Sequence, residues 1–191
     1  MRPEAAMRKI IVEAEVSLDG IMGGDNMDFW KQIFSFHSAD VQRYLDDLLQ
    51  TAGALLCGRT TYEGFAKVWP TREGKMADTI NALPKHVASR TLKAPLAWNA
   101  SLIEGDVAKA IEKLKHEPGK PLVQYGVGEL TRTMLQSGLV DELRLLVFPF
   151  TFGEGLRVFE RMGVHTLKLV STKTFESGVV ELRYDPRGKA G

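Results

Sequence analysis

The sequence predicts an α/β fold with a mostly parallel β-sheet, and three observations support this prediction. Short apolar runs alternate with segments of about 10–15 residues whose apolar side chains recur at helical spacing. This alternation implies right-handed crossovers between parallel strands, with helices on both faces of the sheet. The chain then ends in two strand-like runs, at 167–175 and 179–184, joined by a short turn that contains Gly178. An antiparallel hairpin is therefore expected at one edge of the sheet.

Length, composition and charge narrow the class of protein. The 191 residues, 44% of them hydrophobic and 26% charged, are typical of one soluble domain. Lys and Arg number 25 against 24 Asp and Glu, a balance that argues against nucleic-acid binding and against a basic membrane-binding face. One cysteine excludes a disulfide framework, and the four histidines show no metal-ligand spacing. We expect a cytoplasmic protein without a metal, with residues 1–7 as an extension, 8–185 as the domain and 186–191 as a frayed tail.

The individual elements follow from local patterns. Before the hairpin, strands are expected at 9–16, 52–57, 86–89, 121–125 and 143–148. Helices are expected after the N-cap candidates Ser38, Thr60 and Asp106, and between the turn 126–128 and Gly138. The glycine-rich stretch 20–27 is expected to be a mobile loop. The aromatic segment 29–36 shows no clean period. Asp141 and Glu142 point to opposite faces of a strand, which predicts structural roles and no paired-carboxylate chemistry.

Two strand-to-helix turns carry an arginine beside hydroxyl groups. Gly58-Arg59-Thr60 precedes a helix, where free N–H groups and the helix dipole favour an anion. Ser89-Arg90-Thr91 follows the next strand along the chain. Two such turns on neighbouring strands suit the 2′-phosphate that distinguishes NADP from NAD. The alternative is that Gly58 only forms the turn, Thr60 only caps the helix and the arginines are solvated.

A third turn, Gly126-Val127-Gly128-Glu129, has paired glycines before a helix. Glycines at this place let the backbone approach a pyrophosphate closely. The turn lacks the third glycine of the dinucleotide fingerprint GxGxxG, and the alternative is a tight strand–helix junction. Taken together, the three turns favour nucleotide binding.

Longer segments carry a family resemblance: SLDG at 17–20, LLCGRTTYEGF at 55–65, the turn 87–92, and the block 126–159. That block contains GVGELTRTML, SGLVDELRLLVFPF and FGEGLRVFE. Over about residues 8–184 the chain resembles the dihydrofolate reductase superfamily, most closely its RibD C-terminal-like branch. The resemblance implies a twisted eight-stranded, mainly parallel sheet with helices on both faces and a reversed last strand. It also implies NADPH as the cofactor and a homodimer formed through a sheet edge.

The resemblance also implies places for cofactor and substrate. The 2′-phosphate and adenosine side would be held by the first two turns, and the pyrophosphate and ribose by the third. The expected cofactor-binding residues are Gly58, Arg59, Thr60, Ser89, Arg90, Gly126, Val127, Gly128, Glu129 and Leu130. The loop 17–24 would cover the nicotinamide. Ser17, Trp30 and Phe34 are expected against the substrate, with core packing as the alternative for the two aromatic residues.

Hydride transfer requires a proton donor where charge develops on the substrate. The candidates are Asp19, Asp40 and His37. Asp19 is alternatively a turn residue, Asp40 a carboxylate stabilised by a helix dipole, and His37 a loop histidine. Asp40 lies near the place where folate reductases carry an acid, close to the start of their first long helix.

The function expected from this resemblance is that of an NADPH-dependent reductase. It would transfer hydride to a small heterocyclic or carbonyl/imine substrate, and it resembles the 5-amino-6-(5-phosphoribosylamino)uracil reductase of riboflavin biosynthesis. No deaminase domain precedes the reductase-like segment, and one cysteine cannot form the zinc deaminase signature. Two alternatives remain open: a dihydrofolate- or pterin-type reductase, and a non-catalytic nucleotide-binding dimer.

Overall fold

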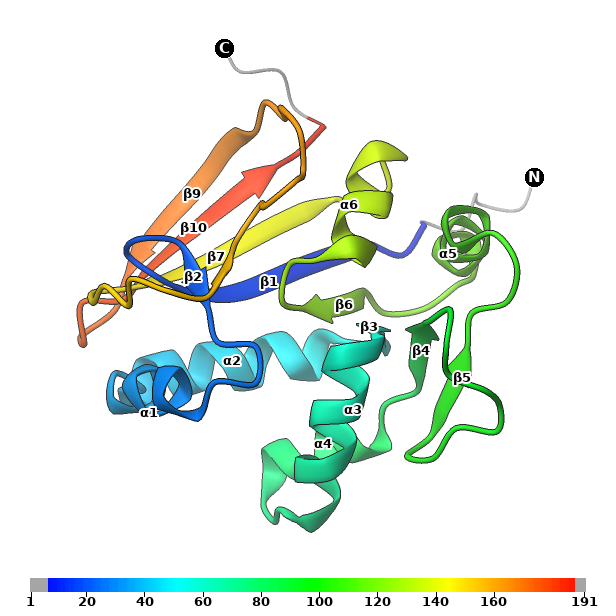
Figure 1. Ribbon diagram of the computed structural model, residues 1–191, viewed down its shortest axis with the longest axis horizontal. Helices are drawn as coiled ribbons and strands as arrows, with labels where there is room; N and C mark the ends of the chain where they lie inside the picture. Colours follow the sequence, from blue (N-terminus) through cyan, green and yellow to red (C-terminus); the bar gives the residue numbers. More distant parts are fainter. Residues whose placement is uncertain (1–6, 188–191) are drawn as a thin grey trace.

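A computed structural model describes residues 7–187 and has an eight-stranded sheet at its centre (Figure 1). The strand order is β5-β4-β3-β6-β1-β7-β10-β9. Six neighbouring strands run parallel, and β10 runs antiparallel to both of its neighbours. The strands are β1 (Ile10–Ser17), β3 (Ala54–Gly58), β4 (Lys85–Ala88), β5 (Ala100–Leu102), β6 (Leu122–Tyr125), β7 (Glu142–Phe148), β9 (Lys168–Thr174) and β10 (Val180–Asp185). The predicted fold class and the C-terminal hairpin are confirmed.

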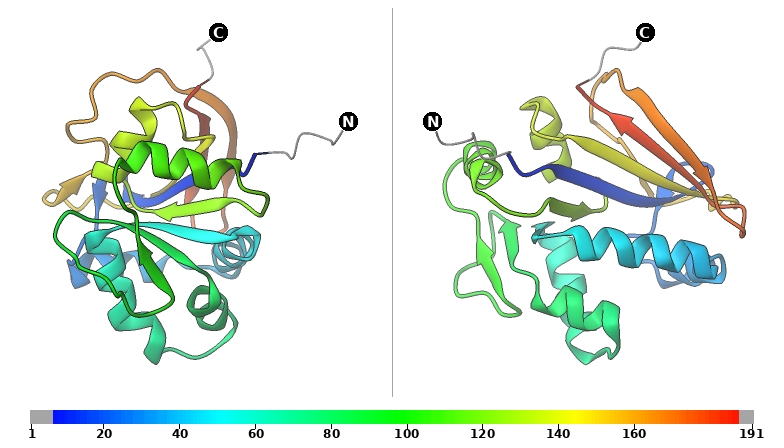
Figure 2. Two further views of the ribbon diagram at one scale, coloured as in Figure 1. Left: turned by 90° about the vertical axis from the view of Figure 1, so that its right-hand side faces the viewer. Right: turned by 180° about the vertical axis from the view of Figure 1, so that it is seen from behind.

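Helices cover both faces of this sheet (Figures 1 and 2). One face carries α1 (Met27–Ser35), α2 (Ala39–Thr51), α3 (Arg59–Val68), the short 3-10 helix η1 (Trp69–Thr71) and α4 (Lys75–Ala82). The other face carries α5 (Val107–His116) and α6 (Glu129–Gln136). The core is divided accordingly, because Ile111 and Met134 pack on one side of β1 while Leu48 and Leu49 pack on the other.

The alternation of side chains along β1 explains its sequence. Val12 and Val16 face α5 and α6, whereas Ile11 faces α2. A strand that is covered on both faces reads as a nearly continuous apolar run. Glu13 and Glu15 interrupt that run, and both lie on the α2 face because they share the period of Ile11.

Some predicted helix ends are confirmed and others are wrong. The Asp106 carboxylate accepts the Lys109 N–H at 3.0 Å, and Gly138 ends α6 with φ +65°. The capping box at Thr60 is wrong, because α3 begins at Arg59 and has Gly58 at its N-cap. Ser38 occupies the N-cap of α2, but its hydroxyl donates to the Asp40 carboxylate and caps no backbone N–H.

The stretch 20–27, expected as a mobile loop, is largely ordered by pairing. Strand β2 (Ile21–Met22) pairs antiparallel with β8 (Leu156–Arg157) in a separate two-stranded sheet. Asn26 then caps α1, where its Oδ1 accepts the N–H groups of Asp28 and Phe29 at 3.0 and 3.3 Å. Helix α1 therefore occupies most of the aromatic segment for which no period was found. The elements α4 and β5 were also absent from the sequence prediction.

The predicted ends of the domain are only partly covered by the structure. Residues 1–6 and 188–191 of the expected extension and tail lie outside the described residues. Within the expected tail, Nη1 of Arg187 lies 2.7 Å from Oδ1 of Asp141, and the frayed tail stays a prediction. Within the described residues, no helix is long and apolar enough to cross a membrane.

Candidate functional site

The three predicted turns lie near the point in the sheet where the helices that follow the strands change from one face to the other. Strands β3 and β6 are neighbours, yet α3 follows β3 onto one face and α6 follows β6 onto the other (Figure 1). In open α/β sheets, ligands bind outside the carboxyl ends of the strands at such a switch point. The turn after β4 lies beside it, since β4 is the other neighbour of β3.

A pocket of about 310 Å³ opens at the N-terminus of α6. Three of the predicted cofactor residues line it: Val127, Gly128 and Glu129. The opposite wall comes from β2 and from the segment that contains β8. Three arginines also line the pocket, namely Arg132, Arg157 and Arg161. A helix N-terminus surrounded by arginines is suited to phosphate groups, although Arg132 also forms an ion pair with Glu129.

The backbone of the 126–128 turn explains why two glycines are present. Gly126 has φ +79°, a conformation that favours glycine. Gly128 is extended, with φ −165°, and a Cβ added there would meet no atom within 4 Å. The Gln124 amide donates to Gly126 O at 2.9 Å and to Thr131 Oγ1 at 2.6 Å, which fixes the turn from behind. Gly128 lines the pocket, and nothing packs where its Cβ would be.

The other two predicted turns meet each other. Nη1 of Arg59, at the start of α3, lies 3.5 Å from Thr91 Oγ1 in the turn after β4. The Ser89 hydroxyl accepts the N–H groups of Thr91 and Leu92 at 3.2 and 3.0 Å, so it shapes its own turn. Arg59 and Arg90 are thus placed on adjacent turns, as the sequence suggested for a 2′-phosphate site.

Asp19 is held as a carboxylate by hydrogen bonds. It accepts the Ser17 hydroxyl at 2.6 Å and the N–H groups of Phe152 and Gly153 at 3.1 and 2.8 Å. These bonds, led by that from Ser17, lower the pKa of Asp19 to about 2. A group that stays ionised at neutral pH is a poor proton donor, and Asp19 instead ties the loop after β1 to the segment before β8.

Asp40 has a comparable structural role. It accepts the Ser38 hydroxyl and the N–H groups of Val41 and Glu176, both at 3.0 Å. The bond from Ser38, followed by that from Glu176, lowers the pKa of Asp40. The carboxylate joins the start of α2 to the turn of the β9–β10 hairpin. The geometry therefore argues against Asp40 as a catalytic acid.

The predicted substrate residues differ in what they can offer. Ser17 is 1% exposed, and its hydroxyl is engaged by Asp19 and by the Ile21 N–H at 2.9 Å. It is therefore not free to bind a substrate. Trp30 donates its indole N–H to Gly24 O at 2.9 Å and stacks on Phe34 with ring centroids 6.1 Å apart. Phe34 remains 49% exposed, so an aromatic face is available beside the loop.

The structure reveals a pair that the sequence analysis did not find. Nε2 of His37 lies 3.2 Å from Oε1 of Glu15, and both side chains are largely buried. His37 was considered as a donor, whereas Glu15 was not considered at all. The two residues are 22 positions apart, and only the packing of the segment before α2 against β1 brings them together. The only signal for Glu15 is that it interrupts the otherwise apolar strand β1; nothing in the sequence links it to His37.

Behind the pair lies a buried polar layer between the sheet and α2. Burial, followed by repulsion from Glu15, raises the pKa of Glu13 well above its usual range. The hydroxyl of Tyr44 donates to Oε1 of Glu181 at 2.8 Å. Glu13 Oε1 and the Tyr125 hydroxyl have no hydrogen-bond partner among the described residues. Unsatisfied buried groups are uncommon in proteins and often mark functional regions.

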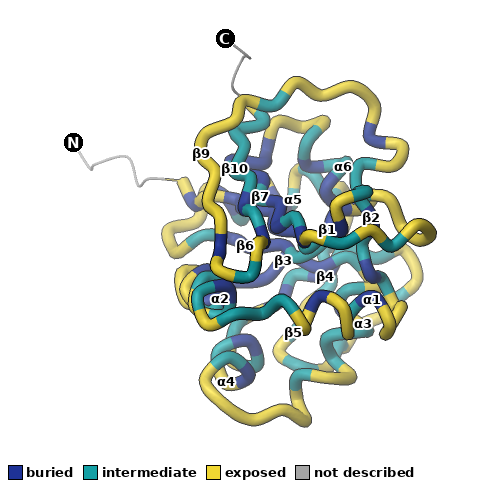
Figure 3. The backbone as a smooth tube through the Cα atoms, turned by 90° about the vertical axis from the view of Figure 1, so that its left-hand side faces the viewer, coloured by how far each residue is buried: buried dark blue, intermediate teal, exposed yellow. Residues whose placement is uncertain are grey.

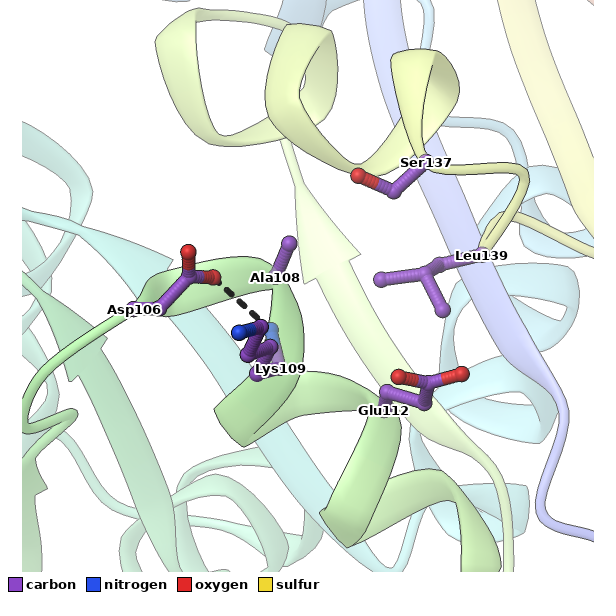
Figure 4. Close-up of a pocket in the computed structure, with 6 residues that line it drawn as sticks. All are labelled: Asp106, Ala108, Lys109, Glu112, Ser137 and Leu139. Atoms are coloured by element: carbon purple, nitrogen blue, oxygen red, sulfur yellow. Dashed lines mark hydrogen bonds between the residues drawn. The ribbon is translucent and has the colours of Figure 1, made fainter.

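A second pocket, of about 240 Å³, lies between α5 and the end of α6 (Figure 4). Its lining includes Asp106 and Glu112 on one side and Ser137 and Leu139 on the other. None of the predicted site residues lines it. The Asp106 carboxylate is already used as the helix cap, so this pocket gives no indication of chemistry.

The fold and the arginine-lined pocket define a doubly wound α/β protein with a pocket at the carboxyl ends of its parallel strands. Comparison with known families makes the assignment specific. The family model of the RibD C-terminal domain matches residues 8–181. The chain belongs to this family, which confirms the resemblance seen in the sequence.

Individual relatives agree with this assignment. "Uncharacterized protein YyaP" of Bacillus subtilis (strain 168) is 31% identical over 187 residues, which cover 95% of this chain and 96% of that protein. Among solved structures, a putative riboflavin biosynthesis protein from Shewanella sp. PV-4 superimposes with a TM-score of 0.75 at 19% identity, over 94% of this chain and 99% of that chain. A pyrimidine reductase-like protein from Corynebacterium diphtheriae gives 0.67 at 14% identity, over 95% and 93%.

A solved structure whose name combines a deaminase and a reductase is longer than this chain. The deaminase/5-amino-6-(5-phosphoribosylamino)uracil reductase of Thermotoga maritima matches with a TM-score of 0.64 at 14% identity. The match covers 94% of this chain but 57% of the Thermotoga protein. At these identities, the solved structures show that the fold is shared.

Proposed function

We propose that this protein is an NADPH-dependent reductase that transfers a hydride to a small heterocyclic or carbonyl/imine substrate. The observation that carries the proposal is the pocket at the α6 N-terminus, which is lined by Val127, Gly128 and Glu129 together with three arginines. Membership of the RibD C-terminal family supports it. The reductase named in the Thermotoga maritima protein supports a pyrimidine with a phosphoribosylamino group as the substrate class.

The residues fit a dinucleotide phosphate in two places. The turn 126–130, with Arg132, Arg157 and Arg161, would hold the pyrophosphate and ribose. The adjacent turns with Arg59 and Arg90 would hold the 2′-phosphate. The cofactor, when bound, supplies the hydride. The loop 17–24 would exclude water from the nicotinamide end, and its position is fixed by Asp19.

A thermal-shift titration with NADPH and NADH tests this proposal. NADPH at 100 times its Kd should stabilise the parent protein by about 2.7 kcal/mol, or roughly 5–10 °C in Tm. Gly128→Val should keep the Tm of the free protein, because its backbone is extended and the added side chain enters open space. The same side chain occupies the pocket, so the shift with NADPH should be lost. Arg59→Ala with Arg90→Ala should reduce the NADPH shift to the size of the NADH shift.

Gly64→Val is the matched control for this titration. A Cβ at Gly64 also meets no atom within 4 Å, but this residue lies in the middle of α3 and lines neither pocket. The Gly64→Val protein should therefore keep the full NADPH shift. Absence of any shift in the parent, or an undiminished shift in Gly128→Val, would exclude the assigned cofactor site.

We also propose a homodimer formed through the free edge of β9. Every residue of this strand is exposed (Figure 3), including Leu169 at 49% and Val170 at 58%. The unpaired N–H and C=O groups of an exposed edge strand are a template for pairing with another chain. Sedimentation equilibrium should give twice the chain mass of 21.2 kDa. Val170→Lys should give the monomer, whereas Val164→Lys, at a 99% exposed apolar residue outside the strand, should not. A monomeric parent would refute this proposal.

A further inference from the structure

We propose that His37 is the proton donor of the reduction and that Glu15 positions its ring, an inference that rests on the proposed function. The pair occupies the carboxyl end of β1, where the sheet presents its ligand-binding edge. Glu15 lies two residues before Ser17, the last residue of the strand. Neither Asp19 nor Asp40 can easily supply the proton, because their hydrogen bonds keep them ionised.

The contacts of the two imidazole nitrogens differ. Nε2 faces Oε1 of Glu15 at 3.2 Å, so the carboxylate accepts the Nε2 proton and fixes the orientation of the ring. Nδ1 makes no hydrogen bond to any of the described residues. The His37 and Glu15 side chains are 16% and 13% exposed, which limits competition from water. This is the arrangement in which a carboxylate orients a histidine for proton transfer at its other nitrogen.

Aromatic side chains surround the imidazole and define where a substrate can lie. The His37 ring is 5.5 Å from Phe34 and 6.0 Å from Phe148, between ring centroids. Phe148 is the β7 partner of Ser17, which places His37 over the ends of two adjacent strands. Phe34 also stacks on Trp30, beside the loop 17–24. A flat heterocycle would stack on this aromatic face, where Phe34 is 49% exposed.

The same loop connects the pair to the cofactor pocket. The Ser17 hydroxyl accepts the Ile21 N–H at 2.9 Å, and the next residue, Met22, lines the pocket at the α6 N-terminus. The pair lies on the α2 face of β1, while the pocket lies on the α6 face. The loop 17–24 thus leads from the end of β1, which carries Glu15, to the wall of the pocket.

Other charged and titratable groups share this face of the sheet, and they set the field at the pair. They are Glu13, Tyr44, Tyr125, Arg144, Glu181 and Arg183. Arg144 is neutralised by Glu142, with Nη2 to Oε2 at 2.7 Å, and Tyr44 donates to Glu181. Glu13 is 2% exposed, and burial, the largest cause, raises its pKa well above its usual range. Among the acidic groups on this face, Glu15 is the one whose carboxylate oxygen lies against His37.

The proposed reduction of an imine or carbonyl substrate conserves atoms and charge. The substrate carbon gains a hydride from the nicotinamide, and the π-electron pair of the C=N or C=O bond moves onto the nitrogen or oxygen. That atom takes the proton from Nδ1 of the imidazolium. His37 becomes neutral, keeps its Nε2 proton on the Glu15 side and regains the Nδ1 proton from water.

The test is NADPH oxidation measured from about pH 5 to 9, the range over which histidines titrate. The probe substrates are 5-amino-6-(5-phosphoribosylamino)uracil and 7,8-dihydrofolate. We expect kcat of the parent to fall towards high pH; His37→Gln should lower kcat about 100-fold or more and should remove that fall. Its KM and its thermal shift with NADPH should stay within about twofold of the parent. Glu15→Gln should lower kcat, Glu15→Asp should restore part of it, and His116→Gln on α5 should match the parent.

A second measurement does not depend on turnover. In ¹H–¹⁵N correlation spectra of the neutral imidazole, His37 should carry its proton on Nε2 in the parent and should show a mixture of tautomers in Glu15→Ala. A proton on Nδ1 in the parent would overturn the assigned orientation. A His37→Gln protein with nearly parental kcat would overturn the inference alone. NADPH binding without oxidation of either probe would also overturn it, whereas a parent that does not bind NADPH would overturn the proposed function as well.

Discussion

Asp141→Asn is expected to lower the free energy of unfolding by about 3–5 kcal/mol. The Asp141 carboxylate is 8% exposed and serves three partners. Its Oδ2 accepts the Ile10 N–H at 2.7 Å and forms an ion pair with Lys115, and its Oδ1 pairs with Arg187. Lys115 is itself only 6% exposed, and its remaining partner is Leu139 O at 2.8 Å. The neutral amide would leave this buried ammonium group without a counter-charge.

Urea unfolding of a double-mutant cycle measures this contribution. Lys115→Met should be tolerated better than Asp141→Asn, because Asp141 keeps Arg187 and the Ile10 N–H as partners. The double variant should lose less unfolding free energy than the two single variants lose in sum. Asp28→Asn, in the exposed pair with Lys31, should leave the unfolding free energy unchanged. A loss below about 1 kcal/mol in Asp141→Asn would contradict the assigned role.

Glu13→Gln is expected to stabilise the protein increasingly as the pH rises. Burial raises the pKa of Glu13 in the folded state, whereas in the unfolded chain it is about 4.3. Above that pH the folded state therefore binds more protons than the unfolded state, and stability falls with rising pH until the folded-state pKa is passed. The slope from this one group is at most about 1.4 kcal/mol per pH unit. Glutamine has the shape of the protonated acid and lacks the titration.

The measurement is the unfolding free energy in urea at several pH values between about 5 and 9. The Glu13→Gln profile should be flatter than that of the parent, and the two should diverge towards alkaline pH. Glu104→Gln, at an exposed glutamate, should reproduce the parental profile. Parallel profiles for Glu13→Gln and the parent would show that burial of Glu13 has no such cost.

The sheet and most of its helices could be predicted because burial leaves a periodic pattern. Strands covered on both faces read as apolar runs, and α2 shows its stripe through Val41, Leu45, Leu48 and Leu49. Helix α1 was not predicted, because its aromatic residues do not all face the core and so leave no regular apolar period. Phe29 and Ile33 enter the core, whereas Trp30 and Phe34 stack outside it. Strands β2 and β8 have two residues each, too short for any period, and they form only because the fold pairs them.

In the candidate site, too, some features could be predicted from the sequence and others could not. The turn 126–128 could be recognised because a backbone that must be left-handed or open to a ligand requires glycine, which the sequence displays directly. The His37–Glu15 pair could not be recognised, because its two members come from separate elements and their distance depends on packing. The same is true of Asp19, whose partners Phe152 and Gly153 lie more than 130 residues further along the chain. Residue type suggested an acid there, but the hydrogen bonds that determine its charge are tertiary.

The backbone pairing of β2 with β8 in the two-stranded sheet connects the two ends of the proposed nucleotide site. Ile21 and Met22 pair with Arg157 and Leu156, so the loop over the nicotinamide end is bonded to the strand that carries an arginine of the phosphate end. A phosphate that restrains Arg157 also restrains this loop, and the free-energy coupling must be equal in the reverse direction. In the proposed complex, a nucleotide held at Arg157 and a substrate under the loop would therefore each strengthen the binding of the other.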